Sequence, residues 1–236
     1  PQDSARTRSK LAEQHFNEVI LFFDSLFGKY PFSKEKYGQA QFGWGGGMEH
    51  QTMSFIGNFD AYLLIHELAH QWFGDKITCG SWEDIWLNEG FASYIEYLAV
   101  HELFPQWQIW DQFIVEDHNT ALSLDALSNT HPVEVPIHHP GEISEIFDKI
   151  SYSKGASIIR MLANYIGETA FRDGLRYYLK KHSYKNTETV HLWEAFEKVS
   201  KKPITKLMAR FTLQPGFPVI SVSQNKQAVT FSQERF

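Results

Sequence analysis

Two histidines spaced by one helical turn, with a glutamate further along, are the residues best suited to chemistry in this chain. His66 and His70 lie in the pattern HELAH, and Glu89 follows His70 after eighteen intervening residues. On a helix, side chains four positions apart leave the same face, so both imidazoles can bind one small cation. Two histidines and one carboxylate suit a catalytic zinc, because they leave a fourth position for water. The spacing therefore predicts a hydrolytic site with one Zn²⁺ per chain.

Glu67 is placed to act as the base of such a site. It follows His66 directly, and a carboxylate beside the predicted metal can take a proton from water. A chance match to a short pattern is the alternative, since 11 of the 236 residues are histidine. The helix-compatible apolar pattern of AYLLIHELAHQWFG and the carboxylate on a second predicted helix both argue against chance.

A glycine-rich segment, residues 45–50 (GGGMEH), is the second candidate for chemistry. Gly46, Gly47 and Met48 can form backbone that a substrate approaches closely. The carboxylate of Glu49 can pair with a positively charged amine and fix how far a peptide enters. Taken alone, the segment is also explained by a tight bend that ends in a solvated carboxylate. Beside a zinc site, it predicts a substrate-binding strand.

A tyrosine next to a helix is the third candidate. Tyr152 lies in ISYSKGAS, directly before a helix that we expect Ser153 to cap. A phenol near the metal can donate a hydrogen bond to the oxyanion of a tetrahedral intermediate. Since the chain has ten tyrosines, a packing role for this one is the alternative.

Metal-bound histidines usually donate their other ring nitrogen to an acceptor, and the sequence offers candidates for that acceptor. Glu96, seven residues after Glu89, projects from nearly the same helix face, although a surface position is the alternative. Asp148 and His131 are weaker candidates. The aromatic residues expected to pack around the site and exclude water are Trp72, Trp82, Trp86, Phe73 and Phe91.

The first half of the chain must position the zinc residues. An apolar pattern of helical period predicts an amphipathic helix over 9–27. Two short strands are expected within 37–57, on either side of the glycine-rich link. Asp60 is the expected N-cap of the HELAH helix and Gly74 its end, and a second helix from near Asn88 carries the zinc-binding glutamate.

The second half is expected to be helical up to a C-terminal hairpin. Three prolines predict a loop over 128–142, and alternation after Pro215 predicts two strands around a turn at 225–226. A lone hairpin has too little core to be stable. We therefore expect a catalytic domain over 1–214 and the first hairpin of a truncated β-sandwich domain over 215–236. Helices are expected over 105–127, 154–166, 168–182, 188–200 and 204–213.

Composition argues against several classes of protein. A formal net charge of −6 without a basic run does not suit nucleic acid or an anionic membrane surface. No apolar stretch approaches the roughly 20 residues of a spanning helix, so no membrane insertion is expected. The single Cys79 cannot form an internal disulfide, so the sequence does not indicate a cellular compartment. The oligomeric state is likewise not readable from the composition. Pro1 as first residue suggests a fragment of a longer protein.

The three patches together resemble the M1 family of zinc aminopeptidases. The family pattern is GxMEN, then HExxH, eighteen residues and E, then a Tyr in YxKG. The segments LFGKYPF, WEDIWLNEGFASYIEYLA and LQPGFPVISV extend the resemblance through nearly the whole chain. It implies an α+β, mainly helical fold, namely a thermolysin-like zinc metalloprotease domain with a small mixed sheet lobe, a helical lobe and the zinc cleft between them.

The resemblance also implies an activity, the release of single amino acids from peptides that have a free N-terminus. One position departs from the pattern, since His50 stands where the family has Asn, which puts substrate affinity and pH optimum in question. The implied roles are zinc binding by His66, His70 and Glu89, water activation by Glu67, anchoring of the α-amine by Glu49, and transition-state stabilisation by Tyr152.

Other interpretations remain beside this one. The same fold supports zinc epoxide hydrolases, and nothing in the chain selects for a lipid substrate. A non-catalytic interaction domain is the alternative from a different class, and it would be expected to lack Glu67, a zinc ligand or Tyr152, all of which are present. An endopeptidase is disfavoured by Glu49, because an anion at the amine position selects for a free N-terminus.

Overall fold

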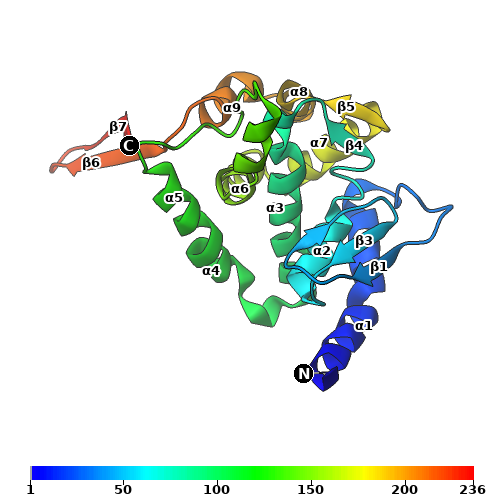
Figure 1. Cartoon of the computed structure of the whole chain (residues 1–236). Coiled ribbons are helices and arrows are strands. Elements are labelled where there is room, and N and C mark those ends of the chain that lie inside the picture. The colour runs from blue at the N-terminus through cyan, green and yellow to red at the C-terminus, as the bar shows by residue number, and fades with distance from the viewer. Residues whose placement is uncertain (1) are drawn as a thin grey trace.

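Helix α3 (Trp86–Leu103) lies at the centre of the fold, and other helices pack around it (Figure 1). The computed structural model describes residues 2–236, with side chains from residue 15 onward. Most side chains of α3 are buried, Trp86 and Phe91 completely. A helix that is buried on most of its faces is stable only inside a protein core. The architecture is α+β and mainly helical, with three small sheets in the described residues.

The opening helix α1 spans Gln2–Phe27, which confirms the amphipathic helix predicted over 9–27. Phe23 on its inner face packs edge-on against Trp72, with ring centroids 5.6 Å apart. The helix stops at Gly28, whose φ of 89° is a conformation that favours glycine. The helix thereby buries its apolar side against the segment that follows the HELAH motif.

The glycine-rich segment belongs to a three-stranded sheet. Its strands are β1 (Gly38–Gln41), β2 (Gly47–Met48) and β3 (Met53–Ile56), in the order β1-β3-β2. β1 is parallel to β3, and β2 is antiparallel to it. The prediction of two strands was therefore incomplete, because part of the glycine link itself pairs with β3. That pairing fixes Met48 opposite Phe55.

Helix α2 (Ala61–Ala69) carries the first half of the predicted zinc set. Asp60 caps it as predicted, since its side chain accepts the backbone N–H of Tyr62 at 3.0 Å. The helix ends with His70 as its C-cap, before the predicted end at Gly74. The chain tightens there because the amides of residues 71 and 72 bond to carbonyls only three residues back.

The joint between α2 and α3 contains a strand that the sequence did not reveal. β4 (Ile77–Cys79) pairs in parallel with β5 (Lys185–Thr187), more than a hundred residues further along the chain. A short 3₁₀ turn, η1 (Trp82–Asp84), then leads into α3. Asp84 accepts hydrogen bonds from the backbone and side chain of Thr189, at 2.9 and 2.7 Å. These contacts fix the start of α3.

Two glycines let α3 and α6 (Gly155–Ile166) cross at very short distance. A Cβ atom added to Gly90 would lie 3.1 Å from Cα of Gly155, and one added to Gly155 would lie 3.1 Å from Cα of Gly90. A larger residue at either position would push the helices apart. The crossing matters for chemistry because Glu89 directly precedes Gly90 and Tyr152 lies three residues before Gly155.

The helix predicted over 105–127 is broken in two places. Gln108 has a left-handed φ of 49°, and a π-helical turn interrupts the remainder. Hydrogen bonding five residues back, as in a π turn, shifts the register of the following helix. The resulting pieces are η2 (Pro105–Trp107), α4 (Ile109–Phe113), η3 (Ile114–His118) and α5 (Asn119–Asp125).

The later helices agree with prediction to within one or two residues. The stretch predicted as a loop over 128–142 is irregular until η4 (Pro140–Glu145). A second π turn, η5 (Ile150–Lys154), precedes α6 and was not predicted. The remaining helices are α7 (Glu168–Lys181), α8 (Thr189–Ser200) and α9 (Ile204–Thr212).

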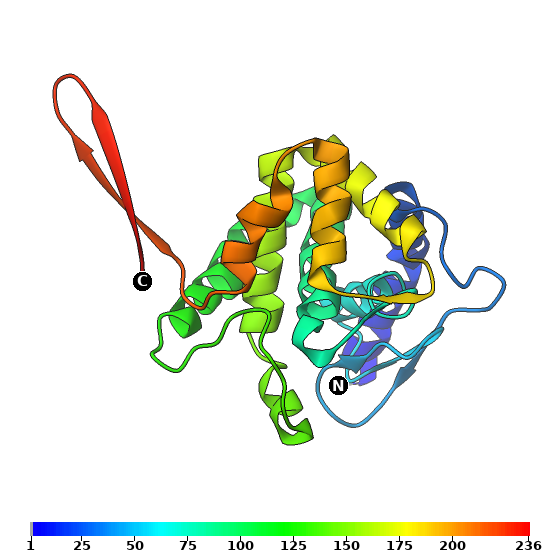
Figure 2. The ribbon, with the colours of Figure 1, turned by 90° about the horizontal axis from the view of Figure 1, so that it is seen from above.

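The predicted C-terminal hairpin is present and projects from the helical body (Figure 2). Strands β6 (Pro218–Gln224) and β7 (Val229–Arg235) pair antiparallel, and the Asn225 side chain accepts two backbone amides in the turn. Nearly every hairpin residue is exposed, including Phe231 at 67%. Among the described residues, no helix has the length and apolarity needed to cross a membrane.

Candidate active site

The three residues predicted to bind zinc converge in the structure. One donor atom from each of His66, His70 and Glu89 lies within 4.8 Å of the other two. The Nε2 atoms of His66 and His70 are 3.5 and 3.4 Å from Oε2 of Glu89. All three side chains are largely buried. Helix α2 sets the separation of the two imidazoles, and the packing of α3 on α2 brings in the carboxylate.

The other ring nitrogens of the two histidines are held by acceptors. Nδ1 of His66 lies 2.8 Å from Oε2 of Glu96, and Nδ1 of His70 lies 3.0 Å from the carbonyl oxygen of Phe73. Because a carboxylate and a carbonyl only accept, both Nδ1 atoms donate, and each Nε2 atom becomes a possible ligand once it loses its proton. Two lone pairs and a carboxylate oxygen that face one another fit a divalent cation such as zinc. Glu96 is confirmed as the partner of His66.

The electrostatics of the cluster favour positive charge. Burial lowers the pKa of His66, but hydrogen bonds to Glu89 and Glu96 outweigh burial and raise this pKa to about 9. Burial also opposes ionisation of Glu89, yet the charges of His70 and His66, with their hydrogen bonds, hold its pKa well below the usual range. Glu89 is therefore an anion, and the cluster attracts cations.

Glu67 lies beside the three candidate donors and lines the same cavity as they do. The residue is 3% exposed, and its Oε2 atom has no hydrogen-bond partner among the described residues. Burial raises the pKa of Glu67 to about 7, against the opposing charges of His70 and His66. A buried oxygen without a partner is unusual unless it serves chemistry. A carboxylate with a pKa near neutrality can accept and return a proton.

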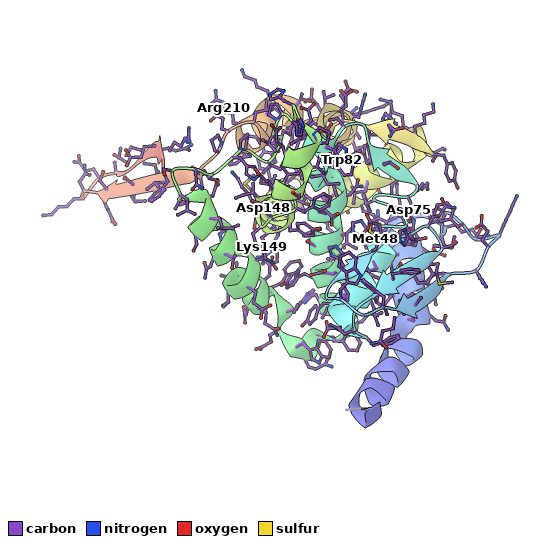
Figure 3. All side chains as sticks on the ribbon, viewed as in Figure 1. Met48, Asp75, Trp82, Asp148, Lys149 and Arg210 are labelled. Carbon is purple, nitrogen blue, oxygen red and sulfur yellow. The ribbon has the colours of Figure 1, made fainter. Side chains whose placement is uncertain are left out.

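Strand β2 lies directly against Glu67. A Cβ atom at Gly47 would lie 2.0 Å from Oε1 of Glu67, so any larger residue would displace the carboxylate. Next along the strand, the half-exposed Met48 lies at the edge of the small sheet (Figure 3). An oxygen of Glu49, one of Glu67 and a ring nitrogen of His70 also lie within 4.8 Å of one another. The glycine-rich segment thus carries Glu49 to the metal donors.

A single cavity of about 610 Å³ connects these groups. This volume falls in the range of sites that bind small molecules or part of a peptide. Two walls come from the β2 strand and from α2, and a third from the residues around η5. The cavity lining includes all residues that the sequence predicted to bind metal, to act in catalysis or to bind substrate, namely Gly46, Gly47, Met48, Glu49, His66, Glu67, His70, Glu89 and Tyr152.

Tyr152 reaches the cavity from η5. Its ring stacks on the imidazole of His66, with centroids 6.1 Å apart and planes inclined by 10°. Burial, followed by the charge of Glu89 and a hydrogen bond to it, raises the pKa of Tyr152 well above its usual range. The phenol therefore stays protonated and can serve as a hydrogen-bond donor.

Three expectations about the surroundings of the site were wrong. Ser153 does not cap a helix that begins after Tyr152, because both residues lie inside the π turn and the Ser153 hydroxyl bonds to Asp117. Trp82 is 47% exposed and packs edge-on against Phe147, whereas the other aromatic residues of the predicted set are buried. Asp148 and His131 hydrogen-bond to each other and not to a metal-binding histidine.

His50, the departure from the family pattern, does not line the cavity among the described residues. Its ring packs edge-on against Phe55, with centroids 5.1 Å apart. His50 therefore contacts strand β3, next to the segment that carries Glu49. It brings no imidazole into the cavity itself.

Sequence reasoning missed some residues of the cavity wall. Tyr62 stands one helical turn before His66 on α2, so the period that pairs the two histidines also indicates this position. Asn58 and Phe147 come from irregular segments, where no periodic signal exists. Phe147 is 42% exposed and forms part of the rim near Tyr152.

An HExxH helix and a distant glutamate, brought together in a mainly helical α+β fold, form a site of the metallohydrolase type. Sequence comparisons identify the family. The model of the Peptidase family M1 domain matches residues 58–211. The chain belongs to this family, which confirms the resemblance seen in its motifs.

Relatives with assigned names come from plants, archaea and fungi. Aminopeptidase M1-D of Oryza sativa subsp. japonica is 48% identical over 75% of this chain and 20% of its own length. Leucyl aminopeptidase of Saccharolobus solfataricus is 44% identical over 75% of this chain and 22% of its own length. Aminopeptidase 2 of Candida albicans is 38% identical over 93% of this chain and 26% of its own length. The chain spans about a fifth to a quarter of the length of these relatives.

Proposed function

We propose that the protein is a zinc-dependent aminopeptidase that removes single amino acids from peptides with a free N-terminus. The observation that carries this proposal is the position of Glu49, which lines the same cavity as Glu67 and lies within reach of the candidate metal donors. An anion next to the reacting centre fits the positively charged α-amine of a peptide and rejects a chain that continues past this point. Membership of the M1 family supports the same conclusion.

His66, His70 and Glu89 would hold the zinc ion, which when bound supplies Lewis acidity for activating water and polarising the peptide carbonyl. Glu67 accepts the proton of the attacking water through the oxygen that has no partner among the described residues. With its pKa near 7, the carboxyl can then deliver this proton to the departing nitrogen. A single residue thus serves as base and as acid.

Tyr152 stabilises the negative charge that develops on the carbonyl oxygen. Its raised pKa keeps the hydroxyl protonated over the working pH range, so the group donates a hydrogen bond throughout the reaction. Glu49 holds the α-amine, and Gly46, Gly47 and Met48 form the wall along which the first residue lies. The fixed amine position places the first peptide bond, and no other, at the reacting centre.

The finer architecture belongs to the same proposal. The three-stranded sheet and the helices around α3 suit the small lobe and helical lobe of a thermolysin-like domain, here assigned to residues 1–214. The exposed hairpin supports the start of a β-sandwich domain over 215–236, because two strands with so little core need a partner surface.

Aminoacyl arylamides and their N-acetylated counterparts test the proposed activity, with and without a chelator. The full-length enzyme is expected to hydrolyse only the free-amine compounds, and chelation is expected to abolish turnover. Equal rates on blocked and free substrates would exclude an aminopeptidase. Hydrolysis of an aliphatic epoxide in place of the arylamides would favour the epoxide hydrolase alternative.

A further inference from the structure

The turn that carries Tyr152 has an unusual conformation. In η5 (Ile150–Lys154), the amide of Lys154 donates to the carbonyl of Lys149 five residues back, at 3.0 Å. Isolated π turns are rare and are found where surrounding contacts stabilise them, often at functional sites. The position of the Tyr152 hydroxyl therefore depends on the groups that hold this turn.

Asp148 holds the beginning of the turn. One carboxylate oxygen, Oδ1, accepts the backbone N–H groups of Ile150 and Ser151, at 2.9 and 3.2 Å. The backbone carbonyl of the same aspartate accepts the N–H of Tyr152 at 3.1 Å. A side chain that accepts the first free amides of a helix fixes where that helix begins. Asp148, labelled in Figure 3, is thus the cap that Ser153 was expected to be.

His131 orients this cap. Its Nε2 atom lies 3.1 Å from Oδ2 of Asp148, and its Nδ1 atom lies 2.7 Å from the carbonyl oxygen of Pro132. Both partners can only accept, so the ring satisfies both contacts as a cation that donates twice. The charged hydrogen bond occupies Oδ2 and leaves Oδ1 for the backbone amides of the turn.

Asp117 holds the other side of the turn. Its Oδ1 atom accepts the hydroxyl of Ser153, the residue directly after Tyr152, and both side chains are buried. Asp117 itself lies in η3 (Ile114–His118), a second π turn, which packs against η5. The catalytic tyrosine therefore stands between Ser151, whose amide is held by the nearby Asp148, and Ser153, whose hydroxyl is held by Asp117 from a distant segment.

We propose that Asp148 and Asp117 are positioning residues for the Tyr152 hydroxyl, with His131 orienting Asp148. They hold the π turn in the register that points the phenol into the metal cavity. This inference rests on the proposed peptidase function for its kinetic consequence. The effect of Asp148 and Asp117 on the conformation of the η5 turn does not depend on any enzymatic activity.

The first experiment measures the turn directly, by hydrogen–deuterium exchange of full-length protein. Asp148→Ala removes the cap, and we expect the amides of residues 149–155 to exchange at least about threefold faster. Asp148→Asn keeps an acceptor at the cap and should stay close to wild type. Ser153→Ala removes the contact with Asp117 and should also accelerate exchange. Unchanged exchange in Asp148→Ala and Ser153→Ala would overturn the proposal, whatever the protein catalyses.

The second experiment asks whether the cap acts through Tyr152. In the otherwise wild-type enzyme, Asp148→Ala should lower kcat about tenfold or more, with KM changed by less than about twofold. In a Tyr152→Phe background, the same change should cost less than about twofold, because the hydroxyl it positions is gone. Full additivity of the two substitutions would show a merely structural role and overturn the proposal.

A matched control separates this effect from general loss of a helix cap. Glu197 accepts the backbone N–H of Thr205 at the start of α9, at 2.9 Å, and is not among the residues that line the cavity. Glu197→Ala should leave kcat and exchange of the η5 amides unchanged. If the wild-type enzyme shows no arylamidase activity, only the proposed function is contradicted. The exchange experiment still decides whether Asp148 and Asp117 position the turn.

Discussion

Nδ1 of His66 donates a hydrogen bond to Oε2 of Glu96 across 2.8 Å, which links α2 to α3 at the metal site. The bond orients the imidazole of His66, so that Nε2 faces Glu89 as a candidate metal ligand. Glu96 lies two helical turns beyond Glu89 on α3, so one helix supplies both a donor and the partner of another donor. Helix α3 therefore both orients the imidazole of His66, through Glu96, and supplies the carboxylate of Glu89.

Glu96→Gln is expected to weaken zinc binding by about ten- to a hundredfold, because the neutral amide holds the imidazole less firmly. Competition with a chelator of known zinc affinity measures this change. Glu102→Gln, an exposed position on the same helix, is the control and should bind zinc like the wild type. Equal affinity of the Glu96 and Glu102 variants would contradict the role of Glu96.

Glu67→Gln should lower kcat by about 10²- to 10⁴-fold, since the amide cannot accept a proton from water. Zinc content, measured by atomic absorption, should remain one ion per chain because Glu67 is not among the three donors. His70→Ala should lose zinc as well as activity. Turnover retained in the Glu67 variant would exclude this residue as the base.

Glu49→Gln should reduce kcat/KM for free-amine arylamides about a hundredfold, because the partner of the charged α-amine is lost. Rates on N-acetylated substrates, already low, should not fall further. The ratio between the two substrates is the measurement. A matched change at the exposed Glu35 should leave this ratio unaltered, and an unaltered ratio in the Glu49 variant would remove the amine-anchor assignment.

Gly155→Ala should destabilise the protein by about 1 to 3 kcal/mol, since the added methyl group meets the backbone of Gly90 at the α3–α6 crossing. The same displacement should move Tyr152 relative to Glu89 and lower kcat. Gly43→Ala is the control, because a Cβ atom there meets no neighbour within 4 Å. Chemical denaturation provides the stability, and equal values for both variants would contradict the close crossing.

The His131–Asp148 pair should make stability depend on pH. The hydrogen bond that His131 donates to Asp148 raises the pKa of His131 above its ordinary 6.5, so the contribution of His131 to stability is complete below pH 6.5 and is lost as pH rises through the folded-state pKa. Burial opposes ionisation of Asp148, but the bond and charge of His131 lower its pKa below the ordinary 3.8. Its contribution is therefore present above pH 3.8 and is lost as pH falls.

Because the pKa of His131 is raised and that of Asp148 is lowered, the pair stabilises the protein most between pH 3.8 and 6.5. Because both side chains are partly exposed, the expected size is only about 0.5 kcal/mol. The free energies of unfolding of wild type and His131→Gln, measured at pH 5.5 and 8.5, should differ more at the lower pH. A larger difference at pH 8.5 would contradict the cationic pair.

Much of the helical part of the fold followed from periodicity. The apolar repeats predicted α1 and α6 to α9 closely, since a helix that buries one face repeats every three to four residues. The π turns η3 and η5 have no such signal. They arise from contacts such as Ser153 with Asp117, which join segments 36 residues apart. Strand β4 was missed for the same reason, because its partner β5 is distant in sequence.

The sequence by itself determined the position of the two candidate histidine ligands of this protein and of the glutamate between them. His66, Glu67 and His70 are adjacent on one helix, so the helical period alone fixes their relative directions. Tertiary structure decided the rest of the site. Glu49 and Tyr152 reach the same cavity only because β2 packs on α2 and because Gly90 and Gly155 let two helices touch. Packing between distant segments depends on the shape of all intervening surfaces, which no local spacing records.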